Sequence, residues 1–151
     1  MEIRNAVHPH DFKTYDTDRL RKEFLIEEIF TNGKINMTYS YVDRIIAGGA
    51  FPAEEPLLLE GGKEIGADFF LERRELGIIN IGQDGLILVD GKKYDISPRD
   101  GLYVGMGAKE VVFESKNKDL PAKFYFNSAP AHTHYPSVKI DIKRAKPVKL
   151  G

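Results

Sequence analysis

Hydrophobic and polar residues alternate along much of this chain. From Ile35 to Tyr41 every odd position is apolar or aromatic, which is the period-two pattern of a strand with one buried face. The short apolar run Leu86–Val89 precedes Asp90-Gly91, a pair that favours a tight hairpin turn because both residues tolerate positive φ, and Lys92–Ile96 is the predicted returning strand. Similar runs predict further extended segments at 69–81 (interrupted by Gly77), 102–104, 110–113 and 123–126.

Helical and irregular segments are few. Thr17 is the predicted cap of one short helical turn that runs to Phe24. Many short strands with turns between them predict an all-β antiparallel sandwich or barrel. Gly-rich and Pro-rich stretches predict loops, and a lysine-rich tail predicts a surface strand followed by a linker; these lie at 48–49, 52–62, 130–136 and 139–151.

The amino-acid composition excludes several classes of protein. The 151 residues are 42% hydrophobic and 30% charged, an ordinary globular balance, and one domain of this length can bury a proper core. Twenty-two basic residues against 23 acidic ones leave no basic surplus for a nucleic-acid partner. No cysteine is present, which excludes disulfides and thiol nucleophiles. No apolar run has the length of a signal core or a membrane span, so we expect a cytoplasmic protein with no membrane partner.

The four histidines form two His-x-His pairs, His8 with His10 and His132 with His134. On a strand such residues share a face and can chelate one metal ion, but a site needs further ligands. Prolines inside or beside both pairs favour loops. Surface or hydrogen-bonding histidines are therefore the preferred interpretation, and a metal pair is the alternative.

A charged run, Leu71-Glu-Arg-Arg-Glu-Leu76, interrupts an otherwise apolar segment. If the segment is a strand, Glu72 and Arg74 share one face and can compensate each other's burial. The functional interpretation is a polar barrel interior in which Arg74 holds a carboxylate and Glu72 moves a proton. The structural interpretation is an ion-pair ladder. Asp43 is a second anomaly, because it lies in phase with the buried face of 35–41 and would need a partner.

Several blocks of sequence together resemble one family. These are Phe70-Leu-Glu-Arg-Arg-Glu-Leu-Gly77, Ile79-Asn-Ile-Gly82, Leu102-Tyr-Val-Gly105 and Gly107-Ala-Lys-Glu-Val-Val-Phe113, with support from Ala129-Pro-Ala-His132. They are similar to the 4-deoxy-L-threo-5-hexosulose-uronate ketol-isomerases, and the resemblance runs from about residue 4 to the end of the chain.

The resemblance implies a cytoplasmic bicupin enzyme of pectin and uronate degradation. Such an enzyme interconverts a 4-deoxy-5-keto-uronate and a 3-deoxy-2,5-diketo acid, usually with zinc, as a homo-oligomer that is typically a hexamer. It also implies that residues 1–140 form an N-terminal cupin barrel of jelly-roll type with a short arm, and that 141–151 begin an inter-domain linker. The zinc-binding C-terminal cupin half would be missing, so we expect no metal in residues 1–151 and negligible isomerase activity from this chain alone.

The general pattern of metal ligands in cupins can be compared with the sequence of this N-terminal half. Counting from nearby glycines puts Glu72 and Arg74 at the His-x-His positions, Ile78 at the Glu position and Glu110 at the last His position. A guanidinium among these positions repels a divalent cation, so we expect an Arg-centred ion-pair cluster in place of a metal. The candidates for ligand contact or ion pairing are therefore Glu72, Arg74, Glu110 and His132.

Three functional hypotheses follow. The first is the N-terminal half of the isomerase, which serves as scaffold and oligomer interface. The second is a non-enzymatic cupin that binds a uronate-like anion. The third is a stand-alone metallo-cupin that uses His132 and His134.

Overall fold

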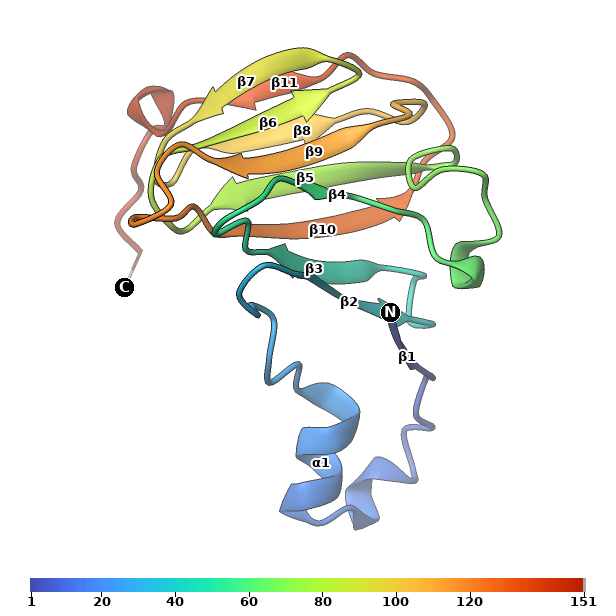
Figure 1. Cartoon of the computed structure of the whole chain (residues 1–151). Helices are drawn as coiled ribbons and strands as arrows, with labels where there is room; N and C mark the ends of the chain where they lie inside the picture. Colours follow the sequence, from blue (N-terminus) through green and yellow to red (C-terminus); the bar gives the residue numbers. More distant parts are fainter. Residues whose placement is uncertain (151) are drawn as a thin grey trace.

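Two facing β-sheets make up the body of the protein (Figure 1). The structure, a computed structural model, describes residues 1–150. One sheet has seven strands in the order β1 (Glu2–Arg4), β2 (Ile35–Ser40), β3 (Ile46–Ala50), β10 (Phe124–Pro130), β5 (Arg74–Asn80), β8 (Gly101–Val104) and β11 (Val138–Ile140). The other has four, in the order β4 (Leu57–Leu58), β9 (Val111–Ser115), β6 (Gly85–Val89) and β7 (Lys92–Ile96).

This architecture confirms the expected all-β class. Every strand pair is antiparallel except β1 with β2, which run parallel. The expected closed barrel is not formed, because no strand of one sheet pairs with a strand of the other among residues 1–150. The result is an open sandwich whose stability rests on side-chain packing between the two inner faces.

The core lies between the inner faces of the two sheets. Phe113 of β9 packs against Phe124 and Phe126 of β10, with ring centroids 5.4 and 5.9 Å apart. Burial alternates along β5, where Arg74, Leu76, Ile78 and Asn80 all point inward. Arg74 therefore shares the face of the core residues although it is charged.

The hairpin of β6 and β7 confirms the prediction from Asp90-Gly91. Val89 pairs with Lys92, so the loop has two residues. Asp90 and Gly91 have φ values of 48° and 78°, the left-handed conformations that this tight turn requires.

The expected loop at Gly48-Gly49 is wrong, because both residues lie inside strand β3. A β-carbon on Gly48 would overlap the Phe126 ring, and one on Gly49 would overlap the Ile29 carbonyl. Glycine stands here because side chains and backbone approach β3 closely from both sides, not because the chain turns.

The long strand expected at 69–81 is shorter than predicted. Strand β5 begins at Arg74, and the preceding residues form a turn after the short 3₁₀ helix η2 (Lys63–Ile65). Gly77 does not interrupt the strand, which continues through it to Asn80. The glycine pattern was misleading because Gly77 lies opposite Asn127 within a regular ladder.

Asp43 does not lie on the buried face. Strand β2 ends at Ser40, and Asp43 is exposed in the turn to β3, where Asp43 and Arg44 have φ values of 54° and 53°. The alternation at 35–41 is correct for the strand itself, since Ile35, Met37 and Tyr39 pack against the core. The alternating pattern alone could not show that the strand ends at Ser40.

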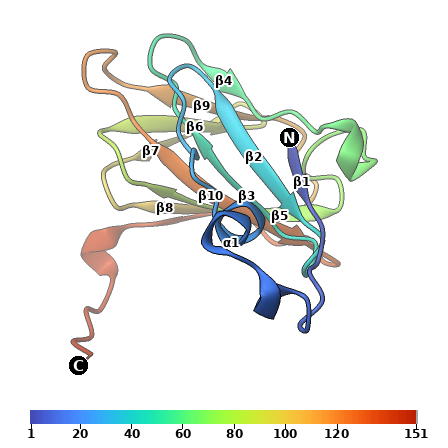
Figure 2. The same ribbon diagram turned by 90° about the horizontal axis from the view of Figure 1, so that it is seen from below.

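The N-terminal arm projects below β2 and β3 (Figures 1 and 2). It contains a 3₁₀ helix η1 (Phe12–Thr14) and the α-helix α1 (Thr17–Phe24). The helix is capped by Asp16, whose side chain accepts a hydrogen bond from the Arg19 N–H at 2.8 Å, and not by Thr17 as predicted. No helix within residues 1–150 is long and apolar enough to span a membrane.

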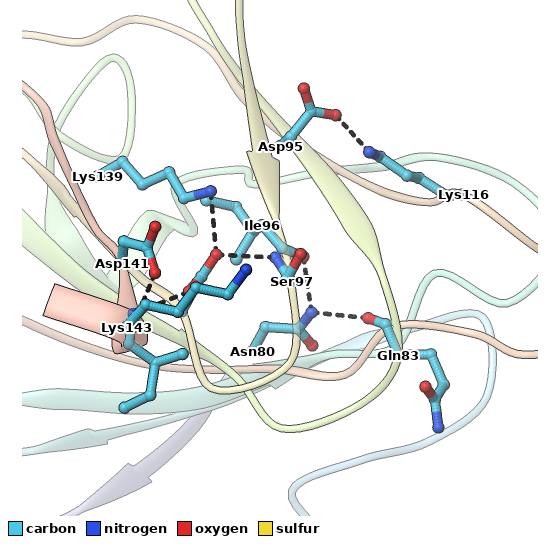
Figure 3. Close-up of polar contacts among 11 residues, drawn as sticks. Asn80, Gln83, Asp95, Ile96, Ser97, Lys116, Lys139, Asp141 and Lys143 are labelled. Atoms are coloured by element: carbon cyan, nitrogen blue, oxygen red, sulfur yellow. Dashed lines mark hydrogen bonds and ion pairs between the residues drawn. The ribbon is translucent and has the colours of Figure 1, made fainter. Parts of the chain in front are cut away.

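Strand β11 pairs with β8 and ties the C-terminal tail to the sandwich. Figure 3 shows Lys139, Asp141 and Lys143 of this tail. Strand β11 is the surface strand expected from the lysine-rich tail. The 3₁₀ helix η3 (Ile142–Arg144) follows it, and the Ile142 N–H donates to the buried Asp100 carboxylate at 3.0 Å. The domain boundary expected near residue 140 stays a prediction.

Candidate functional site

A pocket of about 290 Å³ opens at one end of the sandwich, where β5 begins and β10 ends. We call it the Arg74 pocket. The β2–β3 turn and the η2 segment reach the same end, at the right of Figure 1. It is lined by Tyr39, Arg44, Ile65, Ala67, Arg73, Arg74, Pro130, Ala131 and His132.

Arg74 forms the inner wall of the pocket and is only 7% exposed. Its Nη2 donates to the carbonyl oxygens of Arg44, at 2.6 Å, and Ser128, at 2.8 Å. Its Nε donates to the Ser128 Oγ at 3.1 Å. The guanidinium carbon lies 5.8 Å from the centre of the Tyr39 ring, within reach of a cation–π interaction. Backbone carbonyls, a hydroxyl and an aromatic face therefore solvate the buried charge.

The electrostatics of Arg74 follow from this environment. Burial lowers the pKa of its guanidinium, the nearby Tyr39 raises it, and the positive charge of Arg44 lowers it further. The net direction is downward, but an arginine remains protonated in proteins. Arg74 thus keeps a full charge inside the fold, next to a second cation.

The ion pair expected between Glu72 and Arg74 is not formed. Glu72 precedes the strand, and its Oε2 accepts a hydrogen bond from the Asp68 N–H at 2.8 Å. Strand alternation does not apply to Glu72, because the chain turns between it and Arg74. Glu72 lines a neighbouring shallow hollow instead, and Arg73 lies between that hollow and the Arg74 pocket.

Glu110 does not join the site either. It is exposed just before β9, on the other sheet, and its backbone N–H donates to the Asp90 Oδ1 at 2.9 Å. The expected Arg-centred ion-pair cluster is therefore wrong in its composition. Of the four candidates, the structure brings only Arg74 and His132 together, in the lining of one pocket.

Sequence reasoning missed three contributors to this site, Tyr39, Arg44 and Ser128. Tyr39 was detectable in part, because its phase in the alternating run places it on the inner face. Arg44 contributes its carbonyl because a left-handed turn aims it at Arg74, and Ser128 does so because β10 pairs with β5. No local sequence pattern indicates that Arg44 or Ser128 contacts Arg74.

The histidine pairs do not assemble a metal centre in the part of the chain that the structure describes. There, no three His, Asp or Glu side chains lie together in an arrangement that could hold a metal ion. His8 and His10 stack on each other in the arm, with ring centroids 5.4 Å apart. His134 makes a 2.5 Å hydrogen bond between Nδ1 and the Met106 carbonyl. These residues do not fit the zinc ion that the resemblance implies for the full-length enzymes.

Comparison with known proteins places the chain in a family. The model of the KduI/IolB family matches residues 24–151. The chain belongs to the KduI/IolB family. Its curated relatives include proteins named 4-deoxy-L-threo-5-hexosulose-uronate ketol-isomerase from Caldicellulosiruptor bescii, 55% identical over 151 residues, and Lachnoclostridium phytofermentans, 52% identical over the same length. A protein of the same name from Yersinia pestis is 54% identical over 153 aligned residues.

These family members are much longer than the chain. Each alignment covers 100% of this chain and 55% of the relative, so the chain spans about half the length of the curated relatives it matches. The blocks that carried the resemblance lie within the matched region. The family assignment expected from them is confirmed.

Solved structures with partial likeness are named as cupins. The cupin domain of Schizosaccharomyces pombe Cnp3 covers 64% of this chain at 10% identity and a TM-score of 0.48, with 64% of that domain covered. A cupin protein from Bacteroides fragilis covers 70% at 16% identity and a TM-score of 0.40, with 77% of that chain covered.

Proposed function

We propose that this chain is the N-terminal half of a 4-deoxy-L-threo-5-hexosulose-uronate ketol-isomerase. The observation that carries the proposal is the 55% identity, over every residue of the chain, to a relative of that name. The substrate would be a 4-deoxy-5-keto-uronate, a sugar acid, and the reaction an aldose–ketose isomerisation. The site of action would be the cytoplasm.

The two halves of such an enzyme would have different tasks. The zinc ion would belong to the C-terminal cupin half, since the described residues of this half offer no ligand set for it. This half would supply a rigid sandwich on which the other half and further subunits assemble. Buried hydrogen bonds from Arg74 would keep the end of that sandwich in shape without a metal.

A homo-oligomer is part of the same proposal, with the hexamer as the expected form. The outer surface supports it, because Ile79 on β5 is 48% exposed and Ile140 on β11 is 57% exposed. Large exposed apolar side chains of this kind are common at subunit interfaces.

An activity assay tests the proposal. The 151-residue chain, with and without added zinc, is expected to give no turnover of a 4-deoxy-5-keto-uronate. Co-expression with the C-terminal remainder of the Caldicellulosiruptor bescii relative is expected to restore turnover. The matched control is that remainder expressed alone. Zinc-dependent turnover by the chain alone, or no turnover by a complex that does form, would overturn the proposal.

A further inference from the structure

The Arg74 pocket collects positive charge without any acid in its lining. Arg44, Arg73 and Arg74 all line it, together with His132. Among residues 1–150, none of these three arginines forms a salt bridge, although Arg4 and Arg21 elsewhere do. The pocket therefore lacks a protein counter-charge, and an anion that enters it is attracted by all three guanidiniums.

One edge of the Arg74 guanidinium is available to such an anion. Nε and Nη2 are used by Ser128 and Arg44, whereas Nη1 has no hydrogen-bond partner within the described chain. Every buried side-chain nitrogen of residues 1–150 has a partner, so Nη1 must be accessible to solvent. Arg74 lines the pocket, and its accessible Nη1 carries two N–H donors that are held in place by the other bonds.

The fold also fixes the backbone of Arg44, the second cation of the pocket. Arg44 lies in the β2–β3 turn with φ of 53°, and its carbonyl is bonded to Arg74. Its charge is close enough to lower the pKa of Arg74, after the larger effect of burial. Two like charges held this near each other repel, and an anion placed beside both relieves the repulsion.

From these contacts we propose that the Arg74 pocket binds a small oxyanion, the carboxylate of a sugar acid or a phosphate group. Guanidinium groups match both anions with paired N–H donors. A volume of about 290 Å³ lies just below the range for drug-sized ligand sites, roughly 300–1,000 Å³, which suits a small ligand such as a monosaccharide acid or a phosphate. The site stands independently of the isomerase proposal, because it rests only on residues of this chain.

Isothermal titration calorimetry on the 151-residue chain tests the site. The probes are D-galacturonate, inorganic phosphate and the uncharged D-galactose at equal concentrations. Saturable binding of at least one anion and none of galactose is expected. Galacturonate binding without phosphate binding assigns a sugar carboxylate, and the reverse assigns a phosphate. Absence of binding by both anions would overturn the proposal.

Arg44→Asn is the decisive variant, because asparagine tolerates the left-handed backbone and leaves the Arg44 carbonyl in place. The matched control is Arg99→Asn, since Arg99 is also exposed and left-handed, with φ of 71°, but does not line the pocket. We expect at least tenfold weaker anion binding for Arg44→Asn and no change for Arg99→Asn. Equal affinities in the two variants would refute the site.

A second variant keeps the test decisive if Arg44→Asn disturbs the turn. Arg73→Met removes another lining charge and one side-chain hydrogen bond, from Nη2 to the Gly66 carbonyl at 2.6 Å. It should also weaken anion binding severalfold while the far-ultraviolet circular dichroism spectrum stays that of the wild type. Unchanged binding in this folded variant would count against the proposal.

Discussion

Lys139 of β11 reaches back to Asp100, and the two residues form an ion pair with 3.0 Å between Nζ and Oδ2. Asp100 is only 3% exposed and also accepts hydrogen bonds from the backbone N–H groups of Ser97 and Ile142. One carboxylate thus joins the turn before β8 to the C-terminal tail. In Figure 3, Lys139 is drawn near Ser97 of this turn and near Asp141.

Replacement of that carboxylate should destabilise the protein in a pH-dependent way. Burial alone raises the pKa of Asp100, but hydrogen bonds from Ile142, Lys139 and Ser97 outweigh it, so the pKa is lowered. Asp100→Asn is expected to reduce the free energy of unfolding by about 2–3 kcal/mol at neutral pH, because hydrogen bonds to a charged group are lost. Urea unfolding followed by circular dichroism measures this.

The sign of the pH dependence follows from the lowered pKa. The unfolded chain binds the proton first, so the contribution of Asp100 is complete above its unfolded pKa of about 3.9 and is lost as the pH falls through the folded value. The difference between wild type and Asp100→Asn should shrink over that window. Asp119→Asn, at an exposed aspartate, serves as control. A difference that persists at lower pH would contradict the account.

Arg74 should stabilise the fold through hydrogen bonds and not through an ion pair. Arg74→Met is expected to reduce the free energy of unfolding by about 2–4 kcal/mol, because the Arg44 and Ser128 carbonyls lose a charged donor. Ser128→Ala removes only the Nε contact and should cost about 1 kcal/mol.

A double-mutant cycle measures the coupling between these two residues. Because Arg74 and Ser128 are in contact, their effects should not add, and an interaction energy of about 0.5–3 kcal/mol is expected. Asp119→Asn combined with Arg74→Met is the control, since Asp119 is exposed in the loop before β10 and the two effects should add. Strict additivity of the Arg74 and Ser128 variants would show that the hydrogen bond between them contributes nothing.

Tyr103 should affect stability at alkaline pH. Its hydroxyl donates to the Glu75 Oε2 at 2.8 Å, and burial, together with this carboxylate, raises the pKa of Tyr103 to about 12. The unfolded chain loses the phenolic proton near pH 10, whereas the folded chain keeps it. Stability should therefore decline as the pH rises from about 10 towards 12.

Tyr103→Phe isolates that contribution. Chemical unfolding of the wild type and the variant between pH 9 and 11.5 should show a shallower decline for the variant. Tyr125→Phe, at a half-buried tyrosine on β10, should retain the wild-type decline. Identical slopes for wild type and Tyr103→Phe would exclude the proposed role of Glu75.

The glycines of the seven-stranded sheet should differ in their tolerance of alanine. At Gly48 a β-carbon would overlap the Phe126 ring and approach the Asn36 carbonyl to 2.7 Å, so Gly48→Ala is expected to cost about 1–3 kcal/mol. At Gly77 the nearest atom is the Asn127 Oδ1, at 3.3 Å, and that side chain can move aside, while the Asn127 carbonyl oxygen is 4.0 Å away. Gly77→Ala should change stability by less than about 1 kcal/mol. Thermal melts compare the two, and equal losses would be inconsistent with the packing at β3.

The local chemistry of the sequence determined strand β2, the β6–β7 hairpin and the family. Alternation at 35–41 and the Asp90-Gly91 pair act within a few residues, so they can be recognised without the fold. The blocks around Leu71–Leu76 were sufficient for the family for the same reason. Arg74 also stood out locally, as a charge in an apolar context.

Tertiary structure alone decided what surrounds Arg74. Its partners come from the β2–β3 turn and from β10, 30 and 54 residues away in the chain, and no local pattern links such distant positions. Glu72 was assigned to the site because alternation was extended across a turn, where it no longer holds. A buried charge needs polar partners in place of water. Which residues become those partners depends on which strands pair, and the packing of the whole sandwich decides the strand pairing.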